Sequence, residues 1–334
     1  MVRGAVPVLR QLTGNPEGRL TCLRDASTVC DSMDPRKSLA LVLLAVSAAS
    51  SDGAGWTLSD GNGYRDVLLD GKPVLRHMNA WDPARREDTF KPYTHVFAFD
   101  GKTLLTKGPG GKYTHHRGAF IGWNKSEFDG KSYDFWHCKG VERKHSKYVS
   151  AEEKATANEA VMVSVTDWPT PEGKTVISEK QTVTSRLLAP GKLQLDFAFE
   201  LTAPNGPVKL NGDPQHAGFH FRAAEEVQNH EKDTRYIRPQ GAEDKKGDVW
   251  AECPWVVCDF TVEGKRYSVM HMGALRNPTP SVYSTRAYGR FGNFFTTEVK
   301  PGAPLKLTYR LLVEEEAVAA KEDWAARYEE WSKE

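Results

Sequence analysis

The sequence predicts an all-β protein: a large antiparallel β-sandwich, similar to a supersandwich, that ends in an amphipathic helix. Three observations predict it. Short β-rich runs recur along the chain, Asp/Glu-Gly-Lys turns separate several of them, and helical periodicity is confined to the C-terminus. Many short strands with almost no helix are typical of two packed antiparallel sheets.

The first 50 residues have the pattern of a targeting segment. Met33–Lys37 is a short basic lead, Leu39–Val46 is an apolar run, and Ser47–Ser50 supplies small residues for cleavage. The run is too short for a membrane span, which needs about 20 residues. We interpret residues 33–49 as a secretory signal peptide and residues 1–32 as an extension upstream of the true start. Residues 50–334 are then one secreted or periplasmic domain.

Strand signals dominate the rest of the chain. Turns such as Asp70-Gly71-Lys72 and Glu263-Gly264-Lys265 are typical of tight hairpins, and their irregular spacing argues against a repeat protein. The predicted strands are Arg65–Leu69, Tyr93–Phe99, Gly118–Trp123, Val161–Asp167, Thr175–Leu188, Lys192–Thr202, Gly218–Ala223, Trp255–Val262, Tyr267–Met272, Ser281–Tyr288, Asn293–Glu298 and Leu305–Val313.

Residues 314–333 form the predicted helix. Apolar residues recur there at steps of three or four, and the two tryptophans, Trp324 and Trp331, belong to that stripe. We expect them to anchor the helix in an apolar groove on the sandwich.

Charge and cysteine content narrow the function classes. The formal net charge is +1 and no Lys/Arg cluster forms a basic face, so nucleic acid and anionic membranes are not expected partners. A small-molecule ligand is more consistent with this near-neutral charge than either of these partners. Beyond residue 49 the cysteines are Cys138, Cys253 and Cys258; the last two allow at most one bridge, and Cys138 is a candidate free thiol.

The stretch Lys112–His137 has the composition of a site. It contains three of the ten histidines, an arginine and two tryptophans, side chains that can move protons, bind oxyanions and stack on sugar rings. In a regular strand His115 and Arg117 would share one face and His116 the other. Only a bend, which the preceding Gly108–Gly111 permits, would bring both histidines to one site; otherwise one is a buried structural histidine.

A second stretch, His216–Arg222, alternates polar and apolar residues. As a strand it places His216, His220 and Arg222 on one face. The His216–His220 spacing would also suit two zinc ligands on a helix, but Gly218 and the neighbouring phenylalanines favour an extended chain. We expect the sheet to bring this stretch beside Lys112–His137.

Several motifs, in order, resemble the PmoA-like family of secreted bacterial proteins. They are Pro92–His95, His115–Gly118 with Gly122-Trp123, Asp134–His137, His216–Arg222 and Arg276–Pro280. The family label borrows the name of a methane oxygenase subunit, a membrane enzyme whose spans this chain lacks. The resemblance implies a β-sandwich protein in a setting of sugar breakdown.

Three functions remain open. The first is a carbohydrate-active enzyme, such as an epimerase, a lyase or a glycoside-cleaving enzyme, with histidine general acid–base chemistry. The second is a zinc or copper protein with histidine ligands, although no spacing matches a recognised metal motif. The third is a non-catalytic glycan-binding protein. The candidate catalytic residues are His115, His116, Asp213 and His220, and the candidate substrate-binding residues are Arg117, Trp123, Trp136, His137, His216, Arg222, His271 and Arg276.

Overall fold

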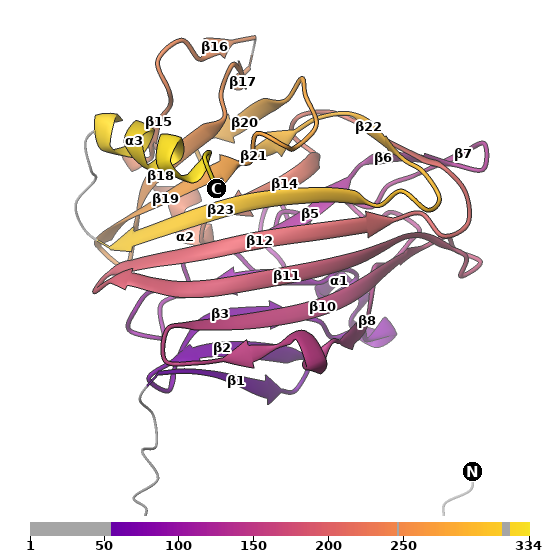
Figure 1. Cartoon of the computed structure of the whole chain (residues 1–334), viewed down its shortest axis with the longest axis horizontal. Coiled ribbons are helices and arrows are strands. Elements are labelled where there is room, and N and C mark those ends of the chain that lie inside the picture. Colours follow the sequence, from indigo (N-terminus) through magenta and orange to yellow (C-terminus); the bar gives the residue numbers. More distant parts are fainter. Residues whose placement is uncertain (1–54, 246, 316–320) are drawn as a thin grey trace, which may run out of the picture. The chain divides into compact units, whose positions relative to one another are not determined.

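Two large antiparallel sheets pack face to face and enclose the main hydrophobic core (Figure 1). The computed structural model describes residues 55–245, 247–315 and 321–334, all within the unit Ser51–Glu334. The expected upstream extension and signal peptide lie outside the described residues. The predicted fold class is confirmed: the described chain is an antiparallel sandwich with a short C-terminal helix.

The first sheet has ten strands in the order β1-β2-β3-β4-β5-β14-β21-β20-β17-β16. Their bounds are Trp56–Gly61, Tyr64–Leu69, Lys72–Met78, Tyr93–Val96, Ala119–Trp123, Ala217–Arg222, Arg290–Phe294, Val282–Arg286, Val249–Ala251 and Glu243–Asp244, in that order.

The second sheet has nine strands, eight of them in the order β15-β18-β19-β23-β12-β11-β10-β8, with β9 paired to β10. The bounds along that order are Arg235–Ile237, Trp255–Val262, Lys265–Gly273, Leu305–Glu315, Lys192–Thr202, Thr175–Ala189, Glu159–Pro169 and Lys144–Tyr148, and β9 is Lys154–Ala155. A small sheet, β22-β13-β6-β7, is formed by Thr297–Val299, Val208–Asn211, Lys125–Phe128 and Lys131–Tyr133.

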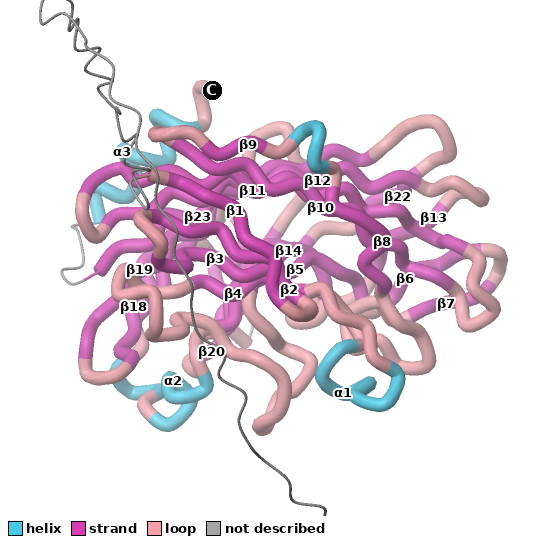
Figure 2. The backbone as a smooth tube through the Cα atoms, turned by 90° about the horizontal axis from the view of Figure 1, so that it is seen from below, coloured by secondary structure: helices cyan, strands magenta, loops and turns pink. Residues whose placement is uncertain are grey.

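Side-chain alternation decides which residues enter the core. Phe219 of β14 points inward and meets Phe197 and Phe199 of β12 at ring-centroid distances of 4.9 and 5.2 Å. Its neighbours His220 and Arg222 therefore point to the outer face of the ten-stranded sheet. Figure 2 shows the two layers, with α1 (Arg86–Thr89) and the loops around it on the side of this sheet.

The predicted turns adopt the backbone that tight hairpins require. Asp70 and Gly71 have φ of 50° and 74°, and Glu263 and Gly264 have 49° and 76°. Two successive positive φ angles characterise the type I′ turn, whose twist matches that of paired strands.

The C-terminal helix covers the outer face of the nine-stranded sheet. α3 spans Lys321–Trp331, and the predicted start at residue 314 is wrong because Glu314 and Glu315 continue β23. Trp324 and Trp331 are buried with Trp255 and Met272 of that sheet, as expected for anchors. A second short helix, α2, spans Glu225–Asn229.

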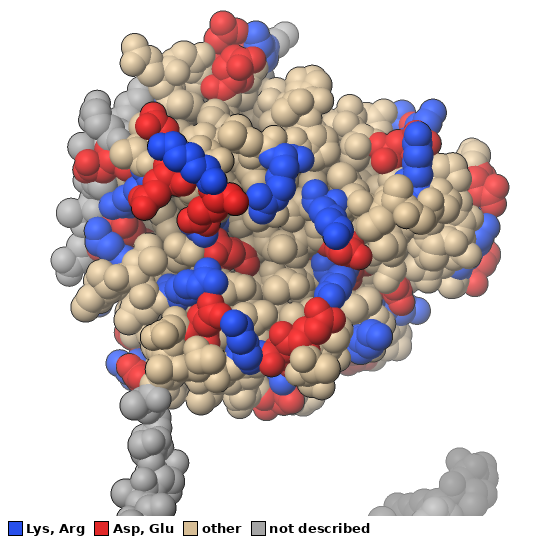
Figure 3. All heavy atoms as spheres, viewed as in Figure 1, with Lys and Arg blue, Asp and Glu red and all other residues tan. Residues whose placement is uncertain are grey.

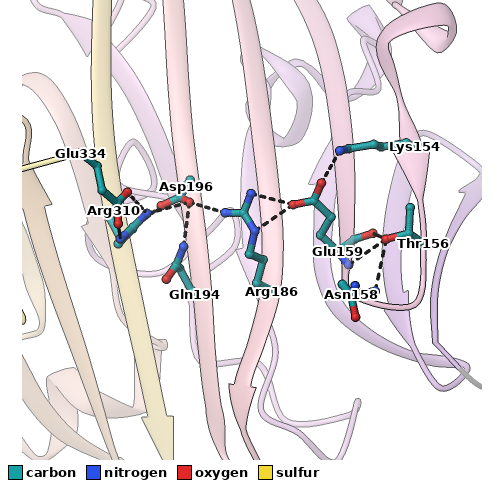
Figure 4. Close-up of polar contacts among 9 residues, drawn as sticks. All are labelled: Lys154, Thr156, Asn158, Glu159, Arg186, Gln194, Asp196, Arg310 and Glu334. Atoms are coloured by element: carbon teal, nitrogen blue, oxygen red, sulfur yellow. Dashed lines mark hydrogen bonds and ion pairs between the residues drawn. The ribbon is translucent and has the colours of Figure 1, made fainter. Parts of the chain in front are cut away.

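Ion pairs cross the same outer face. Asp196 on β12 binds Arg310 on β23 and Arg186 on β11, and Arg186 reaches Glu159 on β10 (Figure 4). Charges of both signs are interspersed on this face (Figure 3). Cys138, Cys253 and Cys258 are buried free thiols, so the bridge left open by the sequence is not formed. No described helix is long and apolar enough to cross a membrane.

Candidate functional site

The ten-stranded sheet brings the two histidine-rich stretches together. β5 and β14 are neighbours, with His220 opposite Phe120 and Gly218 opposite Gly122. The expectation that Lys112–His137 and His216–Arg222 lie side by side is therefore confirmed. The site lies on the outer face of this sheet, opposite the face that packs in the core.

The segment before β5 is a turn and not a strand. The His116 N–H donates to the Tyr113 carbonyl at 3.0 Å. The rings of His115 and His116 are 4.3 Å apart, and each is 5.7 Å from the ring of His216. The bend that adjacent histidines need in order to serve one site is present, so the alternation expected of a regular strand does not apply here.

Three histidines converge: His115, His137 and His216. Each offers a ring nitrogen, and these three nitrogens lie within 4.8 Å of one another. All three side chains are partly exposed, with 18% of His137 and 27% of His216 accessible. Solvent-borne species can therefore reach the cluster.

His137 is oriented by the carboxylate three residues before it. Asp134 Oδ1 accepts the backbone N–H groups of Trp136 and His137 at 3.0 and 2.8 Å, which forms a local turn. Asp134 Oδ2 lies 2.8 Å from His137 Nδ1. A carboxylate only accepts hydrogen bonds, so it holds the proton on Nδ1 and leaves Nε2 with a free lone pair.

His216 is held in the same way. Asp213 Oδ1 accepts the Gln215 N–H at 2.9 Å and lies 3.0 Å from His216 Nδ1. Asn124 of the β5–β6 connection donates to Asp213 Oδ2 at 2.6 Å. Burial raises the pKa of Asp213, but the hydrogen bond and charge of His216 outweigh it and lower that pKa to about 2. The carboxylate is thus ionised at neutral pH.

His115 completes the cluster without a carboxylate. Its Nε2 atom is buried and has no hydrogen-bond partner among the described residues. Burial, followed by the charge of the neighbouring His137, lowers the pKa of His115 to about 3, so its imidazole is neutral at pH 7. Neutral imidazole is the form that binds metals.

The cluster matches the donor set of a metal centre. Carboxylates hydrogen-bonded to ligating histidines are a regular feature of zinc sites, and three histidines leave one position open in a tetrahedral shell. Zinc–nitrogen bonds of about 2.0–2.1 Å put ligands about 3.3 Å apart. Side-chain rotations that bring the three ring nitrogens closer together would complete three positions of the tetrahedral zinc shell.

Lys91 fixes the backbone around the cluster. Its buried Nζ donates to the carbonyls of His115 and Trp136 at 2.7 and 2.5 Å, and it lies 3.5 Å from the Phe120 ring centroid. Burial lowers the pKa of Lys91 well below its usual value. One side chain thereby holds His115 and the residue next to His137.

The floor of the site is aromatic. The Trp136 ring lies 4.5 Å from Phe120 and 4.6 Å from His220. His220 Nε2 is 2.8 Å from the Ala217 carbonyl of its own strand. Burial lowers the pKa of His116 and of His220 well below the usual value. General acid–base chemistry at His116 and His220 stays a prediction.

Four other candidates have structural roles. Trp123 and Trp136 are fully buried, so neither can present a ring face to a sugar. Trp123 donates to the Phe295 carbonyl in the core, at 3.2 Å. Arg117 is buried and donates to the carbonyls of Glu87, Asp88 and Thr114, which fastens the histidine turn to α1. Arg222 donates to the carbonyls of Ala223 and Tyr288.

Two candidates lie away from the cluster. His271 is buried between the sheets, where its Nδ1 is 2.9 Å from the Tyr283 hydroxyl. Arg276 is exposed and donates to Thr308 of β23, on the other sheet. The sequence placed them at a site because both stand near a strand end, and that position alone does not bring residues together.

Sequence reasoning missed several residues of the site. Asp134 had a detectable signal: Asp134-x-x-His137 and Asp213-x-x-His216 share one spacing, which lets a carboxylate form a turn and reach the imidazole. Lys91, Tyr288 and Arg290 carried no comparable signal, because only the fold brings them to the histidines. Tyr113 lies within Lys112–His137 but was not singled out.

Comparison with known families gives an assignment. The sequence model of a family of unknown function, DUF6807, matches residues 65–329. The chain belongs to DUF6807. The match covers the whole histidine site, so the site lies within the region that defines DUF6807. The resemblance to PmoA-like proteins stays a prediction. No match is found among curated proteins.

Solved structures give distant likenesses to this DUF6807 chain. A heparinase III has 12% identity and a TM-score of 0.30, with 81% of this chain and 35% of that chain covered. A GalM/aldose epimerase homologue from C. elegans has 10% identity and a TM-score of 0.37, with 79% and 100% covered. The chain thus spans about a third of the length of the heparinase.

Proposed function

We propose that the protein is a metal-dependent enzyme whose centre is His115, His137 and His216, and that its substrate is a small carbohydrate. The observation that carries the proposal is the pair of Asp-backed imidazoles that meet a third, unpartnered imidazole nitrogen. Zinc and copper are the ions that this all-imidazole set suits best.

The residues support a division of labour. Asp134 and Asp213 hold the two imidazoles in the ligating tautomer, and Lys91 holds the turn that carries His115. A divalent ion bound there would act as a Lewis acid on a substrate oxygen or on water. Epimerisation, β-elimination and glycoside cleavage could each use such activation.

Two partly exposed tyrosines are the proposed contact for the sugar. The rings of Tyr113 and Tyr288 are 4.9 Å apart, and lie 6.1 and 6.4 Å from His116. Such rings can pack against the C–H faces of a sugar. The alternative of a glycan-binding protein rests on exposed indoles, and the two tryptophans predicted to stack on sugar are buried. Export by a signal peptide remains part of this proposal.

Metal analysis of the purified full chain tests the proposal. After reconstitution with zinc or copper we expect one tightly bound ion per chain in the wild type, and its loss in His137→Ala and His216→Ala. His230→Ala is the matched control, because His230 also has an aspartate three residues away but is more exposed.

Activity is then measured on ordinary and oxidised sugars, including 3-keto glycosides. We expect turnover in the wild type and the control only. Wild-type protein that binds no metal, or turnover that persists after the metal is removed, would contradict the proposal.

A further inference from the structure

Arg290 is a buried cation without a counter-charge. Arg290 is the first residue of β21 and is fully buried. It lies opposite Arg222 of β14 on one side and opposite Arg286 of β20 on the other. Arg222 and Arg290 therefore project together from the outer face of the ten-stranded sheet. Like charges directly opposite each other on neighbouring strands destabilise a sheet unless an anion compensates them.

The protein supplies little compensation. Glu225 lies 3.8 Å from Arg222 but is also paired with Lys107, at 3.3 Å. Arg290 donates from Nη1 to the Ser284 hydroxyl at 2.9 Å and lies close enough to the Tyr288 phenol for a side-chain hydrogen bond, while its Nε and Nη2 atoms have no other partner among the described residues. Among the residues that the structure describes, no carboxylate lies at ion-pair distance from Arg290.

Such a group is costly to bury. Removing an unpaired cation from water costs several kcal/mol even after relaxation of the protein. Desolvation lowers the pKa of Arg290, and the nearby Tyr288 phenol counteracts that shift. Buried arginines are normally paired with an anion, so two guanidinium nitrogens, Nε and Nη2, that lack an anionic partner in the protein indicate a partner that arrives from outside.

The guanidinium lies beside the histidine cluster. In the pairing of β14 with β21, Arg290 lies opposite Arg222 and Gly292 lies opposite His220, and the ring of Tyr288, two residues before Arg290, lies 6.4 Å from that of His116. His116 in turn stacks on His216, with an interplanar angle of 22°. Arg290 and the histidine cluster therefore lie on the same outer face of the ten-stranded sheet. The buried atoms His116 Nδ1 and His220 Nδ1 also have no partner among the described residues.

We infer that Arg290, with Ser284 and Tyr288, forms an oxyanion subsite beside the three-histidine cluster, and that the substrate is a sugar bearing a carboxylate, sulfate or phosphate group. The planar guanidinium fork matches two oxygens of such a group. As a substrate subsite this inference rests on the proposed function; as an anion-binding site it does not.

Calorimetric titration of the full chain tests the inference. The probes are glucuronate, glucose 6-sulfate, glucose 6-phosphate and glucose, at constant ionic strength, against metal-loaded and chelator-treated protein. We expect at least one anionic sugar to bind more tightly than glucose, and Arg290→Met to weaken it by about tenfold or more, since a charged hydrogen-bond partner is lost. Glucose affinity should not change.

Two further variants keep the test decisive. Arg276→Met removes an exposed arginine in the turn after β19, which donates to Thr308 of the other sheet, and should leave every affinity unchanged. If Arg290→Met does not fold, Arg290→Lys keeps the charge, loses the fork and should still weaken the anionic sugar.

Equal affinity for glucose and all three anionic sugars, or anion affinity that survives loss of the fork, would overturn the inference. Because anion binding is also measured without metal, a wild type that binds no metal defeats only the proposed function.

Discussion

At the scale of single residues, the site depends on two short Asp-x-x-His turns. In each turn, one carboxylate accepts a backbone N–H and an imidazole N–H. The same carboxylate therefore stabilises the local turn and orients the imidazole that is proposed to bind the metal. The sequence named all three converging histidines, but not their grouping, because the strand alternation assumed for His115 does not hold in a turn.

Asp134→Asn and Asp213→Asn should each weaken metal binding. An asparagine can turn its amide toward Nδ1 and no longer fixes the ligating tautomer, and losses of such supporting partners typically cost about 10–100-fold in affinity. Competition with a chromophoric chelator measures the effect. Asp233→Asn, which alters the pair with His230, is the control; an equal loss there would mean that the aspartates act only through overall charge.

His271 should make the protein less stable as the pH falls. Burial lowers the pKa of His271 to about 3, so between that value and the unfolded pKa of 6.5 the unfolded chain binds the additional proton. The contribution of neutral His271 to the free energy of unfolding is fully present above pH 6.5 and is lost as the pH falls toward 3.

Urea unfolding with chelator present, from pH 7.5 to 4.5, measures this dependence. His271→Gln should reduce the slope by up to about 1.4 kcal/mol per pH unit below 6.5. An unchanged slope would show that this histidine is already protonated in the folded state.

At the scale of elements, β5 and β14 carry the site and tolerate little change where they meet their neighbours. Gly218 has φ of +91°, and a Cβ atom there would lie 1.8 Å from the Asn293 carbonyl oxygen. The closely approaching group is the backbone of β21.

Gly218→Ala should therefore destabilise the fold by about 2–4 kcal/mol, since backbone strain and a steric clash add. Gly140→Ala is the control, because Gly140 has a similar positive φ of +72° but no atom within 4 Å of the added Cβ. Denaturant unfolding of both variants measures the difference, and equal losses would show that strain alone is responsible.

The strands were largely predictable, and most of their partners were not. Lys192–Thr202 and Trp255–Val262 have the predicted bounds, because β-rich runs between turn residues determine them locally. β3 was missed since Pro73 and two charged residues interrupt its pattern. The pairing of β5 with β14 was expected from the histidines that both stretches contain. The pairing of β12 with β23 joins residues more than about a hundred positions apart, which no local pattern encodes.

At the scale of the whole molecule, the outer faces of the two sheets have different roles. The outer face of the ten-stranded sheet carries the histidines, while α3 and the ion pairs of Figure 4 lie on the outer face of the nine-stranded sheet. Changes on the second face should affect stability and leave the site intact.

Trp324→Ala tests this separation. Trp324 belongs to α3 and is fully buried against the nine-stranded sheet, and removing a buried tryptophan typically costs about 3–5 kcal/mol. We expect thermal unfolding at a lower temperature with unchanged metal stoichiometry in the folded protein. A lost metal ion in a protein that is still folded would show that the two faces are coupled.

The central claim is that three imidazoles bind one metal ion. X-ray absorption at the metal edge of the reconstituted full chain tests it most directly. We predict three histidine nitrogens at about 2.0–2.1 Å for zinc, and loss of this signal in His216→Ala. A spectrum without histidine scattering, or one that His216→Ala leaves unchanged, would contradict the claim.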